Sequence, residues 1–198
     1  MPEKPLSQKL HEEPYSFEFF QAVRLLSIIH KDRKGVGGNA MPKDEVVRFR
    51  SRIAFDFPSS EVHEITEVKN GDDPQLEMMV NFMGIAGVSG VLPSHYTEML
   101  LDRIRHRDTA MWEFLDIFTH RSVSLFYRAW QKYRFPIGYE RGESDFTSYL
   151  FDLIGMGTKG LRGRLDIDDE AMLPYAGQIG QRPHNVNALE NIVSDQFQ

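Results

Sequence analysis

The chain has 198 residues, of which 41% are hydrophobic and 12% aromatic, so it can bury a substantial core and is globular rather than disordered. Its 29 acidic and 23 basic residues give a formal charge of -6, which argues against nucleic acid or an anionic membrane surface as its main partner. It has no cysteine, which excludes disulfide scaffolds, thiolate zinc sites and cysteine nucleophiles.

The N-terminal residues 1–14 are predicted to be a flexible segment, and residues 15–198 are expected to form the folded part of the chain. The N-terminal segment lacks the apolar core of a signal peptide, and no apolar run in the chain approaches the roughly 18 residues that a membrane span requires. We therefore expect a cytoplasmic protein.

The first predicted element is a helix from about Ser16 to His30, because apolar residues recur there in a broad helical stripe. The charged, glycine-rich residues 31–45 that follow predict a surface loop. Alternation over VVRFRSRIAF then predicts a strand in which Val47 and Phe49 share one face and the arginines occupy the other.

Two further strands are predicted from Glu61 to Lys69 and from Gln75 to Phe82, around a turn at residues 70–74. We expect these strands to pair in antiparallel fashion, because the turn is too short for a crossover helix. The sheet-containing part of the chain is therefore placed at about residues 45–83.

A helical part is predicted over about residues 94–198, with Ser94 as the N-cap of its first helix. A single helix from Tyr96 to Arg134 would be roughly 58 Å long, so a break is expected near Arg107 to Thr109. Shorter helices are predicted at about residues 145–155, 168–177 and 185–197. The predicted fold class is α+β, predominantly helical with a small antiparallel sheet.

Three glycines, Gly84, Gly87 and Gly90, lie between a predicted strand and a predicted helix, as in a phosphate-binding loop. Their spacing matches neither the dinucleotide-binding nor the P-loop motif, and the loop has no lysine. We therefore interpret these glycines as residues that let the loop turn tightly against a neighbouring surface.

Two carboxylate–histidine pairs, Asp102 with His106 and Asp116 with His120, have the i, i+4 spacing that places both members on one helix face. Neither forms the H-E-x-x-H motif of zinc proteases, so we interpret them as local hydrogen-bonded pairs and assign no catalytic, cofactor-binding or metal-ligating residue. The alternative is a metal-assisted or nucleotide-using enzyme built around His95, Asp102, His106 and His120.

Basic residues outnumber acidic ones, seven to four, between Asp102 and Arg134, where they alternate with aromatic residues. This stretch is either a nucleic-acid-binding module, a solvated helix face or a docking stripe for an acidic protein. We favour the last two, because arginine and aromatic residues are typical of protein-binding hot spots. The residues expected to bind a partner are Phe17, Phe20, Arg24, Tyr96, Arg103, Arg107, Phe126, Arg128, Trp130 and Tyr133.

Several sequence blocks occur in one order along nearly the whole chain. They are FFQAVRLL (19–26), VRFRS (47–51), FPSSEV (57–62), GVSGVLPSHYTEMLL (87–101), the pair Arg107 and Asp108, FLDIFTHRSVSLFYRAWQKYR (114–134), YAG (175–177) and RP (182–183). In this order they resemble the TssG family, also called ImpH or VasB, of bacterial type VI secretion baseplates.

The resemblance implies a non-catalytic structural protein without a cofactor. Members of that family form a cytoplasmic baseplate wedge with a pair of TssF subunits, associate with TssE, and contact TssK, which links the wedge to the membrane complex. We expect the aromatic-rich helices at residues 17–29 and 114–133 to supply the core and the surface held by TssF. Family members continue beyond the segment NALENIVSDQF, so the resemblance implies an N-terminal portion and does not carry over contacts made by later loops.

Overall fold

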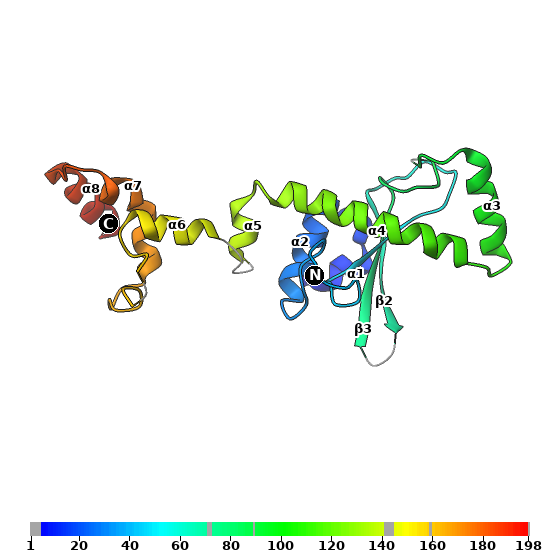
Figure 1. Cartoon of the computed structure of the whole chain (residues 1–198), viewed down its shortest axis with the longest axis horizontal. Coiled ribbons are helices and arrows are strands. Elements are labelled where there is room, and N and C mark those ends of the chain that lie inside the picture. Colours follow the sequence, from blue (N-terminus) through cyan, green and yellow to red (C-terminus); the bar gives the residue numbers. More distant parts are fainter. Residues whose placement is uncertain (1–4, 71–72, 89, 141–144, 159, 198) are drawn as a thin grey trace. The chain divides into compact units, whose positions relative to one another are not determined.

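The computed structural model describes residues 5–70, 73–88, 90–140, 145–158 and 160–197 (Figure 1). The chain divides into two compact units, residues 1–137 and 138–198. The fold is α+β and predominantly helical, with one small sheet, which confirms the predicted fold class apart from the direction of one strand.

The first unit contains the sheet and the two longest helices of the described residues. Two of its helices, α3 and α4, are separated at residues 106–109, so the predicted break is confirmed. Its elements are α1 (Leu6–Glu12), the short 3-10 helix η1 (Pro14–Ser16), α2 (Phe19–Ile29), β1 (Arg48–Ser51), β2 (Val62–Asn70), β3 (Asp73–Val80), α3 (Ser94–Arg105) and α4 (Ala110–Gln131), and α5 (Phe135–Glu140) begins in it.

The sheet is mixed, whereas the sequence analysis expected it to be antiparallel. Its strand order is β1-β3-β2, with β2 and β3 antiparallel as predicted and β1 parallel to β3. Ser51 at the end of β1 and Val62 at the start of β2 lie on either side of Val80. The loop 52–61 therefore passes the end of β3 and leaves room for one strand between β1 and β2. Strand β3 occupies this place and runs parallel to β1.

The core of the first unit joins α2, the sheet and α4. On β1 the side chains alternate, with Phe49 and Ser51 buried and Arg48 and Arg50 half-buried, as the sequence pattern predicts. Within the described residues 5–14, α1 forms and its Leu10 is fully buried in this core. Burial of a large apolar side chain is the physical reason that this short helix is retained.

The second unit contains α6 (Asp145–Leu153), the 3-10 helix η2 (Asp169–Tyr175), α7 (Ala176–Gly180) and α8 (Val186–Gln196). The helix predicted at 168–177 is divided between η2 and α7, and Pro174 lies inside η2. The Tyr175 hydroxyl donates to Asp195 at 2.6 Å and thereby ties η2 to α8. None of the described residues of α8 is buried.

Candidate partner-binding surface

A four-residue elbow, residues 106–109, joins α3 to α4. The amide of Arg107 donates to the carbonyl of Ile104, and the amide of Asp108 donates to that of Arg103, both at 2.9 Å. This is the Schellman arrangement, in which the residue after the helix adopts a left-handed conformation, and Arg107 does so with φ 62°. The Asp108 carboxylate then accepts from the amide of Ala110, the first residue of α4, at 3.3 Å.

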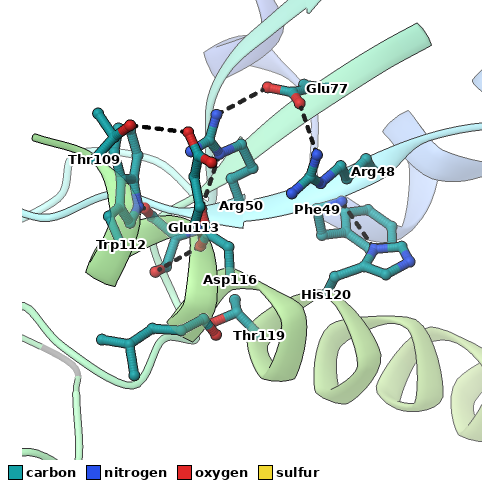
Figure 2. A network of polar contacts seen from close by, with 12 residues as sticks. Arg48, Phe49, Arg50, Glu77, Thr109, Trp112, Glu113, Asp116, Thr119 and His120 are labelled. Atoms are coloured by element: carbon teal, nitrogen blue, oxygen red, sulfur yellow. Dashed lines mark hydrogen bonds and ion pairs between the residues drawn. The ribbon is translucent and has the colours of Figure 1, made fainter. Parts of the chain in front are cut away.

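The inner face of α4 covers the outer edge of β1. The Asp116 carboxylate accepts a hydrogen bond from the amide of Ser51, and His120 Nδ1 accepts one from the amide of Phe49, both at 3.1 Å (Figure 2). The sequence analysis interpreted Asp116 and His120 as a local hydrogen-bonded pair. The structure corrects this interpretation, because both side chains accept hydrogen bonds from the distant strand β1. The physical reason is spacing, because roughly 6 Å separates i and i+4 on a helix and roughly 6.6 Å separates i and i+2 on a strand.

A buried network of charges extends from Asp116 to the sheet (Figure 2). The Arg50 guanidinium donates to Asp116 at 2.8 Å and to Glu77 at 3.2 Å, and it lies 4.2 Å from the ring centre of Trp112. Burial raises the pKa of Asp116, and the bonds from Arg50 and the Ser51 amide oppose that rise. Because buried ion pairs return little net stability, we infer that this network serves mainly to fix α4 in one position on the sheet.

A second polar contact holds the loop before β1 against α4. Buried Glu45 accepts from the amide of Gly37 at 3.1 Å and lies 3.4 Å from His120 Nε2. Arg121 and Arg128 donate to the carbonyl of Gly37 at 3.3 Å and 2.8 Å. Arg128, which the sequence analysis placed among the partner-binding residues, is therefore engaged within the chain.

Substituting Gly37 with alanine is expected to lower the free energy of unfolding by about 2 kcal/mol. The backbone at Gly37 has φ 74°, and an added Cβ would lie 2.8 Å from the carbonyl oxygen of Ser124. Urea unfolding followed by tryptophan fluorescence measures the change. Gly38→Ala is the matched control, since its Cβ would meet nothing closer than 3.8 Å, and equal losses in the two variants would contradict the expectation.

Aromatic rings from α2 and α4 form a cluster near the C-terminal end of α4. Phe20 stacks on Trp130 with centroids 4.5 Å apart and planes at 11°, and it also lies 5.4 Å from Phe126. The guanidinium of Arg134 lies 4.3 Å from the Trp130 ring centre. Phe20 and Trp130 are half-buried while Phe126 stays 41% exposed, so these predicted partner-binding residues contact one another at the rim of the core.

The outer face of α4 carries a row of large apolar side chains that the sequence analysis did not single out. Phe114, Ile117, Phe118 and Leu125, which we call the α4 stripe, are 57%, 60%, 51% and 45% exposed. The rings of Phe114 and Phe118 are 5.4 Å apart. The signal was present in the sequence, because a helix that is apolar on two faces can pack only one of them on its own sheet.

The other predicted partner-binding residues lie in separate places. Tyr96 and Arg103 are exposed on one face of α3 together with Met99, and Arg107 lies in the elbow. Tyr133 is 83% exposed just after α4. Phe17 and Arg24 are half-buried, and Phe17 packs against the core. The structure thus places the predicted residues on several separate parts of the chain and does not gather them into one surface.

The glycine loop packs closely on the chain that leaves β1. A Cβ on Gly84 would lie 2.8 Å from the Cβ of Ser51, and one on Gly87 would lie 3.1 Å from the carbonyl oxygen of Arg52. The Gly87 amide donates to the Thr97 hydroxyl at 3.0 Å, which connects the loop to α3. This geometry agrees with the interpretation of the glycines as packing residues.

In the part of the chain that the structure describes, no group of three histidines and carboxylates could hold a metal ion. His106 lies on the surface with Nδ1 2.8 Å from the Asp102 carbonyl oxygen, and His95 contacts Tyr96. His120 contacts β1 instead. Over the same described residues, every helix is too short or too polar to cross a membrane.

A comparison with protein-family models places the chain among the components of type VI secretion. The matching model is described as "Type VI secretion, TssG" and covers residues 13–198, so the chain belongs to the TssG family. Comparisons with curated proteins and with solved structures gave no match.

Proposed function

We propose that the chain is a structural scaffold subunit of the type VI secretion baseplate wedge. The observation that carries this proposal is the α4 stripe, a row of unburied apolar side chains on a helix whose opposite face is fixed to the sheet. Exposed apolar rows of this kind mark protein-binding surfaces. Membership of the TssG family supports the same conclusion.

The α4 stripe is proposed to bind a TssF-like subunit. Its two phenylalanines supply the aromatic anchors that dominate binding energy at protein interfaces. A helix that presents its side chains at i, i+3 and i+4 fits a groove on a partner. Because Asp116 and His120 hold the helix on β1, little order has to be imposed on α4 when it binds.

TssK-like and TssE-like subunits are the further proposed partners, in keeping with the family resemblance. The exposed face of α3, with Tyr96, Met99 and Arg103, is a second surface that could receive one of them. In this proposal the wedge is cytoplasmic, and the chain meets the membrane only through the rest of the secretion complex.

Co-production of the chain with the TssF-like subunit of the same organism, followed by affinity capture and size-exclusion chromatography, tests the proposal. The wild-type chain is expected to form a stable complex. Phe118→Glu is expected to weaken that complex at least about 30-fold, or about 2 kcal/mol, because it places a charge in a desolvated contact.

Val186→Glu is the control, since Val186 is 78% exposed and lies in the other compact unit. Circular dichroism and urea unfolding should show that both variants remain folded. A wild-type chain that fails to capture the subunit would contradict the proposed scaffold role. Equal capture by wild type and Phe118→Glu would remove the α4 stripe as the binding surface.

A further inference from the structure

The two compact units differ in how much apolar surface they bury. The described core residues, which include Phe19 and Phe49, all lie in the first unit, residues 1–137. In the second unit, Phe151 and Ala176 are the buried residues among those that the structure describes. A domain of about 60 residues is marginally stable even when it has a full core. The second unit therefore has little burial to offset the entropy cost of folding.

The helices α2 and α8 show this difference at equal length, because each has 11 residues. Helix α2 buries Phe19 and Leu26 among others, whereas none of the described residues of α8 is buried. Leu189 and Val193 of α8 share one face with Phe197 just after it, and all three are exposed. Isolated helices shorter than about 12–15 residues are marginal in water, so α8 depends on packing that this unit supplies only in part.

Helix α6 depends on one side chain for its packing. Phe151 is 5% exposed, and the guanidinium of Arg162 lies 4.3 Å from its ring centre. On the same nine-residue helix, Phe146, Tyr149 and Leu153 are exposed. A helix of this length with one buried anchor gains little from its own residues, so its order depends on that anchor.

Hydrogen bonds between segments of the second unit lie at its surface. The Tyr175 hydroxyl donates to the Asp195 carboxylate, and the amide of Gly163 donates to the Asp169 carboxylate, both at 2.6 Å and both exposed. Such bonds replace bonds to water, so their net contribution to stability is small. They orient the segments of the unit and do not substitute for burial.

We propose that α6 and α8 of the second unit open and close independently of the first unit, so that the free chain combines a stable fold with a labile one. Segments with few buried apolar contacts open at a lower free energy than the whole protein. The first unit keeps its core when they open, because that core is formed by its own residues. The proposal does not depend on the scaffold role, since it concerns the chain without a partner.

This arrangement is a conformational device, because order in α6 and α8 becomes adjustable while the first unit stays folded. Any condition that favours burial of apolar side chains shifts the equilibrium towards the closed form. Opening of this kind is measured by amide hydrogen exchange.

Hydrogen–deuterium exchange of the full chain, followed by mass spectrometry, tests the proposal. Amides of α4 and of the β2–β3 pair are expected to exchange at least about 1,000-fold more slowly than those of α6 and α8. Trimethylamine oxide at about 1 M is expected to slow exchange in α6 and α8 at least about tenfold, because the osmolyte favours burial. Equal protection of α8 and α4 would overturn the inference. So would exchange in α6 and α8 at the rate of an unstructured peptide with the osmolyte present, because these helices would then not close.

Phe151→Ala tests whether the two units are independent. The variant removes the buried anchor of α6, so it is expected to abolish the protection that trimethylamine oxide gives to that helix. The urea midpoint of tryptophan fluorescence should stay unchanged, because Trp112 and Trp130 both lie in the first unit. Phe146→Ala on the same helix is the matched control, since that ring is 51% exposed, and it should change neither quantity. A lower fluorescence midpoint in Phe151→Ala would show that the units unfold together and would refute their independence.

Discussion

Asp116→Ala is expected to lower the free energy of unfolding by about 3–5 kcal/mol. The substitution removes a fully buried carboxylate that Arg50 approaches at 2.8 Å and leaves the guanidinium with Glu77 as its remaining ion-pair partner. It also leaves the amide of Ser51 without its acceptor at the edge of β1. Urea unfolding monitored by tryptophan fluorescence is a suitable measurement, because Trp112 lies against Arg50.

Asp102→Ala is the matched control for this prediction. The Asp102 side chain is 67% exposed and its carboxylate lies 3.8 Å from the His106 ring, so we expect a change within about 0.5 kcal/mol. A loss below about 1 kcal/mol for Asp116→Ala would show that α4 is held to the sheet by apolar packing and that the ion network contributes little.

Phe19→Ala is expected to cost about 3–5 kcal/mol of stability. Phe19 is 1% exposed and its ring lies 4.8 Å from Phe82, 5.5 Å from Phe49 and 6.3 Å from Tyr127. Removing the ring opens a cavity where α2, the sheet and α4 meet. Thermal and urea unfolding of the purified chain would measure the loss.

Phe118→Ala provides the contrast, because it removes the same chemical group from a side chain that is 51% exposed. We expect the free energy of unfolding of this variant to stay within about 1 kcal/mol of the wild-type value, because folding removes little of the Phe118 ring from water. A large loss there would mean that the α4 stripe supports the fold of the isolated chain, which would weaken its assignment as a binding surface.

Local patterns predicted much of the secondary structure. The alternation of Val47 and Phe49 with the arginines around β1, the β2–β3 hairpin and the break before Ala110 all depend on short-range signals. These features could be predicted because turn residues, hydrophobic periodicity and limits on helix length depend on residues close together in the sequence. The fold class follows from the same signals.

The strand order and the pairing of α4 with β1 depend on contacts between residues far apart in sequence. The loop 52–61 could have returned β2 beside β1 instead of leaving a position for β3, and nothing local in the loop decides between these routes. Similarly, the spacing of Asp116 and His120 fits a helix surface as well as it fits alternate amides of a strand. The sequence analysis chose the local interpretation, and the distant one holds.

The candidate site shows the same division. Composition directed attention to the helices at residues 17–29 and 114–133, because aromatic residues are dense in both. It could not separate rings that meet one another, such as Phe20 and Trp130, from those of the α4 stripe that face solvent. That separation requires knowing which face of α4 covers the strand.

The bonds from α4 to the amides of Phe49 and Ser51 also bear on how the chain behaves at high local concentration. A strand with unoccupied amides can recruit a strand from a neighbouring molecule and begin open-ended growth into fibrils. Here two side chains already occupy that border of the sheet, so copies crowded together cannot propagate from it while α4 stays in place. Loss of α4 would therefore expose an aggregation-prone seam.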